Sequence, residues 1–329
     1  MTTLIIGGSS QLAFYIIKSL SEQHPGQRIH ATFRSQSRYE QQVLQLTSLN
    51  ISNSNLVPLF VQELNSELLV DLFNKHSVTK VYYLSAINVP STHLDSNLDS
   101  LFFNVHIRDS LSLLNALRFF PEIKSFFTLS SKMFSNFQDV DRLISTDTLP
   151  DPDGLYGATK LECWKNIKKF RDEFEVSAHA AVLFNFESNY RLNKYRADFV
   201  IHKIATDLIR IKKKQASTFS IQNFFDRADW SHALDICNAL LNISNTTTPK
   251  DYIIGSGVAL SLAEITIEAL KLTEDKYLEE YCTELIGKSS VSKPCLIADN
   301  SEARTILKYQ QTKNISSVIY SSYINGLNG

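Results

Sequence analysis

A tyrosine and a lysine four residues apart give the strongest chemical signal in the chain. Tyr156 and Lys160 belong to the stretch Tyr-Gly-Ala-Thr-Lys, and residues four apart share one face of a helix. An ammonium group beside a phenol lowers the pKa of the phenol, so that it can exchange a proton near neutral pH. Ser130 ends an expected strand 26 residues earlier and could hold the same substrate oxygen. These three groups are what hydride transfer between an alcohol carbon and a nicotinamide requires.

A glycine turn near the N-terminus is the second signal. The apolar stretch 3–6 runs into Gly7-Gly8-Ser9-Ser10, and an apolar helical face follows. Backbone N–H groups in such a turn, together with the positive end of the helix, can face a pyrophosphate. In the related enzymes the turn reads G-x-x-G-x-x-G, whereas here Ser10 and Ala13 hold the second and third places. Both are small, so close approach of the backbone remains possible.

Two arginines follow the second expected strand, residues 28–33. Arg34 and Arg38 lie where the adenosine ribose of a bound dinucleotide would be. An acidic residue there would accept a hydrogen bond from the 2′-OH of NAD, whereas arginines suit the 2′-phosphate of NADP. The alternative is a pair of solvated surface arginines. We therefore expect NADP, with NAD the less suitable cofactor.

The elements that must position these residues alternate between strands and helices. A long helix is expected over residues 98–119, and the expected strands are 3–6, 28–33, 56–61, 80–85, 125–130 and 180–185. This alternation predicts an α/β fold with a Rossmann-type, doubly wound parallel sheet and a smaller mixed α/β lobe toward the C-terminus. We expect residues 1–185 to form the NADP-binding domain, with a return segment near 226–256. Residues 186–329 should form mainly the smaller lobe, which would bind the substrate.

The amino-acid composition limits the classes of partner, compartment and metal site that we expect. The 329 residues carry a net charge of −1, which indicates neither a nucleic-acid nor a membrane partner. No apolar run approaches the ~18–20 residues that span a bilayer, and the N-terminus lacks the basic start of a secretory signal. The four cysteines form no C-x-x-C pair and the eight histidines show no metal-binding spacing. We expect reduced thiols, a cytoplasmic location and no metal.

The glycine turn with Ser130, Tyr156 and Lys160 resembles the extended short-chain dehydrogenase/reductases that modify nucleotide sugars. Within them, the chain is most similar to the GDP-mannose 4,6-dehydratase family. The segments that carry this resemblance are YGATKLECWKNIKKFRDEF from Tyr156, LFNFES from Leu183, FVIHKIA from Phe199 and ADWSHALDI from Ala228, with weaker matches in IIGSGVALSLAEI from Ile253 and IADNSEARTIL from Ile297. The resemblance spans nearly the whole chain and implies a nucleotide-sugar substrate, with a GDP-linked sugar favoured, and a homodimer or homotetramer.

The resemblance also implies a role for individual residues. The implied catalytic residues are Ser130, Lys132, Tyr156 and Lys160. The implied cofactor-binding residues are Gly7, Ser10, Gln11, Leu12, Arg34, Glu63, Leu64, Leu84, Ser85, Ala86, Tyr156 and Lys160. The implied substrate-binding residues are Asn185, Lys194, Val200, Lys203 and Arg227.

Two departures from the family pattern bear on the reaction. The family's active-site strand ends Thr-Ser-Glu, and its glutamate removes the C5 proton, but this chain reads Ser130-Ser131-Lys132. The family's Arg-Asp-Trp reads Ala228-Asp229-Trp230, with an arginine displaced to Arg227. The groups for oxidation and reduction at C4 are present, whereas those for elimination are altered. Three functions stay open: a dehydratase, a 4-keto-sugar reductase or epimerase, and an inactive sugar-nucleotide-binding homologue.

Overall fold

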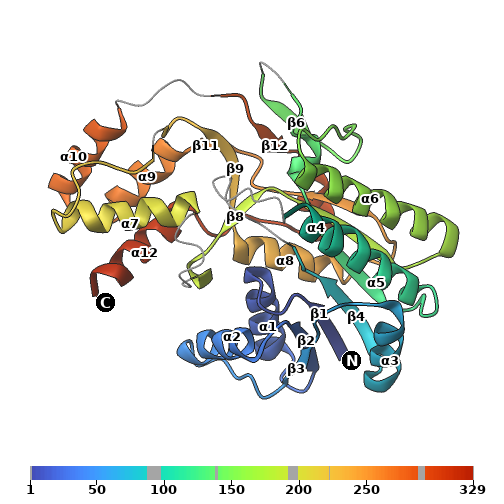
Figure 1. Cartoon of the computed structure of the whole chain (residues 1–329). Coiled ribbons are helices and arrows are strands. Elements are labelled where there is room, and N and C mark those ends of the chain that lie inside the picture. The colour runs from blue at the N-terminus through green and yellow to red at the C-terminus, as the bar shows by residue number, and fades with distance from the viewer. Residues whose placement is uncertain are drawn as a thin grey trace.

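A parallel sheet organises the N-terminal part of the chain (Figure 1). The computed structural model describes residues 2–86, 98–137, 140–191, 199–221, 223–287 and 293–328. Within them, the sheet has seven strands in the order β10-β7-β5-β4-β1-β2-β3, all paired in parallel. The strands are β1 (Thr2–Ile6), β2 (Arg28–Phe33), β3 (Leu56–Phe60), β4 (Val78–Tyr83), β5 (Lys124–Ser130), β7 (Ala178–Leu183) and β10 (Asp251–Ile254). The predicted doubly wound parallel sheet is confirmed.

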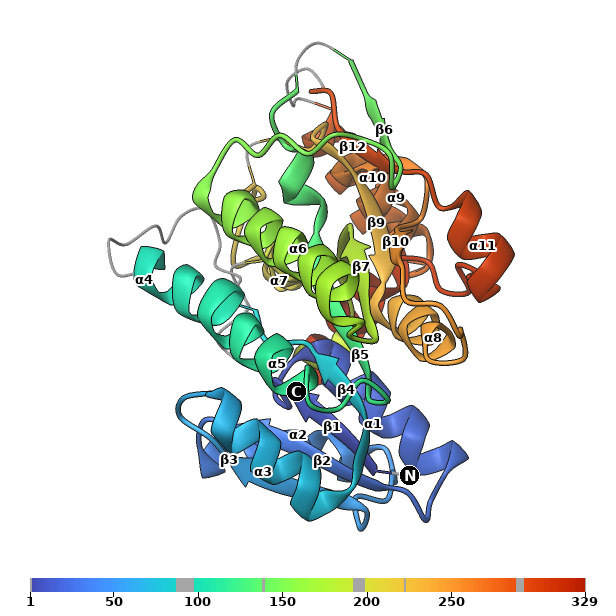
Figure 2. The same cartoon turned by 90° about the vertical axis from the view of Figure 1, so that its right-hand side faces the viewer.

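Helices cover both faces of this sheet, which is why its inner strands consist of nearly continuous apolar residues. One face packs against α1 (Gln11–Gln23), α2 (Gln36–Ser48) and α8 (Ala233–Ile243). The other packs against α3 (Ser66–His76), α5 (Asp109–Leu117) and α6 (Leu155–Phe174). Figure 2 shows α5 and α6 side by side on their face, with α8 and α11 (Ser301–Leu307) toward the opposite side. Each face thus has its own apolar core.

The long helix expected over 98–119 is a composite. It consists of α4 (Leu98–Phe102), the π-helical turn η1 (Phe103–Arg108) and α5. The N–H of Asp109 donates to the carbonyl of Asn104, five residues earlier, which is the hydrogen bond of a π-helix. Regular 3.6-residue periodicity could not predict this widened turn.

The strand expected over 180–185 is two strands. β7 ends at Leu183, and β8 (Asn185–Glu187) begins after Phe184 and leaves the large sheet. β8 pairs in parallel with β9 (Arg227–His232), which pairs in antiparallel with β11 (Ala259–Ser261). This small sheet carries the chain from the parallel sheet to the C-terminal lobe.

The C-terminal lobe has a separate apolar core. Its helices are α7 (Val200–Lys212), α9 (Leu262–Lys271), α10 (Lys276–Ile286) and α12 (Ser316–Asn328), and Figure 1 shows them grouped away from the parallel sheet. The remaining elements are β6 (Arg142–Ile144), which pairs with β12 (Leu296–Ala298), and the short 3-10 turns η2 (Ser131–Phe134) and η3 (Asn189–Arg191). No described helix combines the length and apolarity needed to cross a bilayer. All four cysteines are buried as free thiols.

Candidate active site

The glycine turn has the geometry of a backbone anion site. Gly7 has φ +95°, and a Cβ there would lie 2.9 Å from the backbone nitrogen of Ser85, so only glycine fits. Its N–H donates to Thr32 Oγ1 at 3.0 Å. Ser10 caps α1, because its Oγ accepts from the N–H of Ala13 at 3.1 Å, and Ala13 itself is fully buried. Serine and alanine therefore replace the expected glycines without loosening the turn.

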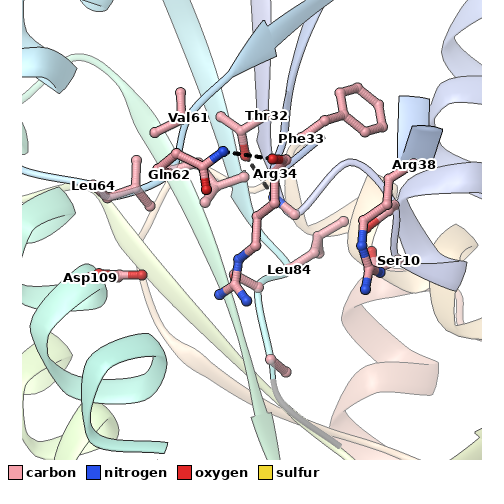
Figure 3. Close-up of a pocket in the computed structure, with 15 residues that line it drawn as sticks. Ser10, Thr32, Phe33, Arg34, Arg38, Val61, Gln62, Leu64, Leu84 and Asp109 are labelled. Atoms are coloured by element: carbon pink, nitrogen blue, oxygen red, sulfur yellow. Dashed lines mark hydrogen bonds between the residues drawn. The ribbon is translucent and has the colours of Figure 1, made fainter. Parts of the chain in front are cut away.

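A cavity of about 250 Å³ opens beside this turn, where β1, β2 and β4 end (Figure 3). The carboxyl ends of parallel strands on either side of a reversal in strand order are where such sheets bind ligands. The residues that line it are Ile6, Gly7, Ser9, Ser10, Thr32, Phe33, Arg34, Arg38, Val61, Gln62, Leu64, Leu84, Ser85, Ala86 and Asp109. Seven of the residues implied for the cofactor are among these: Gly7, Ser10, Arg34, Leu64, Leu84, Ser85 and Ala86.

Charged groups converge on this cavity from two sides. Figure 3 shows the Arg34 guanidinium extending into it, between Asp109 and the neighbouring Arg38. Burial raises the pKa of the Asp109 carboxyl, and the adjacent Arg108 and Arg34 only partly offset this effect. Gln62 donates from Nε2 to the carbonyl of Arg34 at 2.8 Å, and this hydrogen bond links two segments that line the cavity. The cavity suits an anionic, hydroxyl-rich ligand such as a phosphorylated ribose.

Five residues implied for the cofactor do not line the cavity: Tyr156 and Lys160, which are described below, and Gln11, Leu12 and Glu63. Leu12 belongs to the apolar core, and Gln11 is buried and donates from Nε2 to Glu187 at 3.1 Å and to Ser188 Oγ. Glu63 is 76% exposed, and its carboxylate lies 3.8 Å from Arg108. Val61, Gln62 and Leu64 line the cavity, whereas Glu63, within the bend at residues 62–63, does not.

A second cavity, of about 210 Å³, lies beside the first, because β5 pairs with β4 and ends at this cavity. Ser130, Lys132 and Tyr156 line it together with residues of β8 and α7. Its full lining is Leu129, Ser130, Lys132, Tyr156, Leu183, Phe184, Asn185, Phe186, Glu187, Phe199, Val200, Ile201 and Trp230. The structure therefore brings the expected serine and tyrosine together, from two elements that are 26 residues apart in sequence.

Lys160 lies behind this cavity rather than in its lining. It is 2% exposed, and its Nζ donates to the carbonyl of Thr128 at 3.1 Å. Burial lowers the pKa of its ammonium to about 8. Burial also raises the pKa of Tyr156, and a hydrogen bond with Ser130 partly offsets this. The direction is opposite to the one expected from the sequence, because Lys160 donates to a backbone carbonyl and burial of the phenol outweighs the hydrogen bond with Ser130.

The contact between α6 and η2 holds Tyr156 near Ser130. A Cβ on Gly157 would lie 2.3 Å from the carbonyl oxygen of Lys132, so the helix approaches this turn as closely as glycine permits. Ser130 Oγ accepts from the N–H of Lys132 at 3.3 Å, and the Lys132 side chain is exposed at the mouth of the cavity. Lys132 has no ion-pair partner in the described part of the chain.

Only some of the residues implied for substrate binding line the second cavity. Asn185 and Val200 line the second cavity. Lys203 does not line it, and Arg227 is held by Asp141 at 2.8 Å in β9, also outside the lining. Lys194 lies outside the described residues.

Several lining residues were missed from the sequence, among them two with polar or aromatic side chains in each cavity. Gln62 and Asp109 line the first cavity, and Glu187 and Trp230 line the second. Glu187 is two residues after Asn185 on the same strand, so the period of two could have placed it on the same face. Asp109 carries no such signal, because its position depends on the π-helical turn before α5.

Comparison with known proteins assigns the chain to a family. The family model described as GDP-mannose 4,6 dehydratase matches residues 4–321. The GDP-mannose 4,6 dehydratases of Cricetulus griseus and Homo sapiens are each 25% identical over 269 residues, which cover 79% of this chain and 69% of theirs.

Two solved structures share the fold. A UDP-glucuronic acid 4-epimerase from Bacillus cereus, in complex with UDP-glucuronic acid and NAD, has a TM-score of 0.76 at 19% identity, covering 99% of this chain and 100% of that one. A dTDP-glucose 4,6-dehydratase from Bacillus anthracis, in complex with NAD, has a TM-score of 0.78 at 12% identity, covering 100% and 97%.

Gly157→Ala should separate α6 from η2. The added methyl group collides with a backbone carbonyl that cannot rotate away, so we expect a loss of roughly 1–3 kcal/mol in unfolding free energy, as for other overpacked sites. Chemical denaturation measures it. Gly26→Ala is the matched control, because a Cβ at Gly26 has no atom within 4 Å. Equal stability of the two variants would contradict the close contact.

Proposed function

The chain belongs to the GDP-mannose 4,6-dehydratase family, and on that premise we propose that it is an NADP(H)-dependent enzyme acting at C4 of a nucleotide-activated sugar. The observation that carries the proposal is the adjacency of the two cavities. One contains the glycine turn and Arg34, and the other contains Ser130 and Tyr156. We assign residues 1–185, with the return segment near 226–256, to cofactor binding and residues 186–329 mainly to the sugar nucleotide.

Cofactor binding is assigned to the first cavity. The N–H groups at the start of α1 suit the pyrophosphate. Arg34 and Arg38 suit the 2′-phosphate of NADP, and Asp109 could accept from a ribose hydroxyl. The two structural neighbours were solved with NAD, so the preference for NADP rests on these arginines alone.

Proton exchange is assigned to Tyr156. When bound, the nicotinamide ring accepts or returns the hydride at C4. In the oxidation direction, the Tyr156 phenolate takes the proton of the C4 hydroxyl, and the Ser130 hydroxyl holds the same oxygen. In the reverse direction, the phenol returns the proton. Lys160 supplies positive charge behind the phenol, and hydrogen bonding to Thr128 holds it there.

The fate of the 4-keto sugar depends on position 132. Elimination needs a base at C5, and at this position the chain has an exposed lysine in place of the glutamate that the family uses. We therefore favour C4 oxidation or reduction over a complete dehydratase cycle. A 4-keto-sugar reductase or epimerase has the same C4 apparatus. The inactive homologue is disfavoured by the intact Tyr156 and Lys160 pair.

The substrate and cofactor are tested by thermal unfolding. NADPH, NADH and GDP-, UDP- and dTDP-hexoses are added singly and in pairs, and ligands that bind the folded state raise the melting temperature. We expect NADPH together with a GDP-linked sugar to give the largest rise. Product analysis then separates the reactions, since a dehydratase forms a 4-keto-6-deoxy sugar without net cofactor use and a reductase consumes NADPH stoichiometrically. The absence of any shift would support the inactive homologue.

We also propose a cytoplasmic location and a homodimer or homotetramer. Four buried free thiols fit a reducing compartment. Cell fractionation tests the location, and sedimentation velocity tests the assembly.

Arg34→Ala should weaken NADPH binding selectively. A charge-assisted hydrogen bond contributes roughly 1.5–3 kcal/mol, so we expect a rise of about 10–100-fold in the Kd of NADPH and little change for NADH. Arg28→Ala is the matched control, because Arg28 is exposed at the other end of the same strand. Isothermal titration calorimetry measures both. Unchanged NADPH affinity would refute the role of Arg34.

Tyr156→Phe should fold and bind cofactor normally but lose turnover. Removing a positioned proton donor costs on the order of 10²–10⁴ in rate. Tyr281→Phe removes a phenol that donates to the Ser217 carbonyl in the C-terminal lobe and should leave the rate unchanged. Stopped-flow absorbance of NADPH follows hydride transfer. Near-normal turnover in Tyr156→Phe would overturn the assignment.

Lys132→Glu should move the protein toward dehydration. The wild type is expected to dehydrate GDP-mannose weakly or not at all, and the variant to form more of the 4-keto-6-deoxy product, detected by its alkaline absorbance. Lys132→Gln is the control, since it removes the cation without supplying a base. Robust dehydration by the wild type would show that another group removes the C5 proton.

A further inference from the structure

A buried histidine lies beside Tyr156, and the proposed function gives it no role. His106 is on the π-helical turn η1 and is 0% exposed. Its ring centroid lies 5.2 Å from that of Tyr156, with the two planes at 81°. Phe102 stacks on His106 at 5.6 Å and 18°, and also meets Tyr156 edge to face at 5.6 Å. Two rings of one helix thus pack against the tyrosine ring.

His106 is also tied to the helix that carries Tyr156. Its Nδ1 lies 2.9 Å from Thr159 Oγ1, and Thr159 Oγ1 can donate to the backbone carbonyl of Tyr156 at 3.1 Å. A hydroxyl has a single proton, so when Thr159 donates to that carbonyl, Nδ1–H of His106 donates to Thr159. This chain of contacts links the imidazole to the first turn of α6.

The backbone around His106 is itself held in place. The hydroxyl of Tyr83 donates to the carbonyl of Val105, and Ser110 Oγ donates to the carbonyl of His106 at 2.6 Å. A π-turn displaces the following residues from regular α-helical register, and such turns are frequent at functional sites. Here the turn is anchored from β4 and from α5.

The surroundings of His106 favour the uncharged form of its imidazole. Burial, and to a lesser extent the charge of Lys160, lower the pKa of His106 to about 2. His106 therefore does not compete with Lys160 as a cation, nor does it titrate as an acid or base. What it supplies is a fixed ring and a hydrogen bond.

We propose that His106 is a positioning residue for Tyr156, holding the phenol ring edge to face while its Nδ1 anchors Thr159 on the same helix. The proposal deepens the assignment of Tyr156 as the proton-exchanging group and rests on it. A His106 that merely fills space would affect stability alone. A positioning residue affects the orientation of the Tyr156 ring and the rate of hydride transfer.

Two substitutions divide the contacts of His106. His106→Phe keeps a flat ring but removes the bond to Thr159, and His106→Asn keeps a polar atom near Nδ1 but removes the ring. His179→Phe is the matched control, because His179 is also buried, stacks on Phe126 and has a pKa lowered to about 4 by burial, yet lies in β7 outside both cavity linings. Thr159→Val removes the hydrogen bond between Thr159 and His106 but keeps the imidazole ring. This variant tests the proposal if the His106 variants fail to fold.

The first readout needs no substrate. Protein labelled with ¹³Cζ-tyrosine is compared by NMR, with Tyr156→Phe identifying the Tyr156 resonance. We expect the His106 variants and Thr159→Val to shift or broaden that resonance and His179→Phe to leave it unchanged. An unchanged Tyr156 resonance in all three variants would overturn the proposal, even if the protein proved to have no sugar-nucleotide activity.

The second readout is a double-mutant cycle on hydride transfer. We expect His106→Phe to lower kcat by about tenfold or more, with the Kd of NADPH and the KM of the sugar nucleotide changed by less than about threefold, since a small misplacement of a reacting group is costly. In the Tyr156→Phe background the same change should have no further effect, because His106 acts through the phenol. The positioning role would be refuted if His106→Phe lowered kcat equally in the wild-type and Tyr156→Phe backgrounds. It would also be refuted if His179→Phe lowered kcat as much as His106→Phe does. Absence of turnover in the wild type would instead count against the proposed function.

Discussion

The close approach of α6 to the turn after β5 is the constraint on which the candidate site depends. Gly157 lies against the Lys132 carbonyl, so Tyr156, one residue earlier, faces the cavity that Ser130 lines. The helix is fixed along its length as well. Trp164 Nε1 and Arg171 donate to the Asp251 carboxylate of β10 at 2.8 and 2.7 Å. Because β10 begins more than 60 residues after β8 ends, the return of that strand to the sheet helps hold α6 in place.

Burial sets the electrostatics of this site more than any ion pair does. Desolvation raises the pKa of Tyr156 and lowers those of Lys160 and His106. The ammonium and phenol therefore both tend toward their neutral forms, and the gap between their pKa values is larger than in water. Lys160 loses its proton more easily than a lysine in water, and Tyr156 less easily than a tyrosine in water. His106 is neutral as well. A charged imidazole beside Lys160 would lower the pKa of the Lys160 ammonium further.

The sequence predicted the elements that depend on local pattern and missed those that depend on packing between elements. Apolar runs located the strands, and the spacing of Tyr156 and Lys160 located one helix face. The π-helical turn was missed because it is decided by Tyr83 and Ser110 satisfying its carbonyls. Glu63 was placed at the cofactor from the resemblance, but its neighbours Gln62 and Leu64 line the cavity instead, on either side of an exposed Glu63. Arg227 was expected at a diphosphate, whereas Asp141, from a loop far away in sequence, pairs with it.

The two halves of the family's chemistry occupy different elements, which explains how one can change without the other. Ser130 is the last residue of β5, Tyr156 and Lys160 are on α6, and these elements are held by the sheet and by the partly buried carboxylate of Asp251. Position 132 is on the short turn η2, and its side chain is exposed at the mouth of the cavity. A substitution there alters neither a core contact nor the contact with Gly157, which involves only its backbone carbonyl. Under the proposed roles, oxidation and reduction at C4 would be tied to the integrity of the fold, whereas the step that follows would depend on one exposed side chain that can vary at little cost to stability.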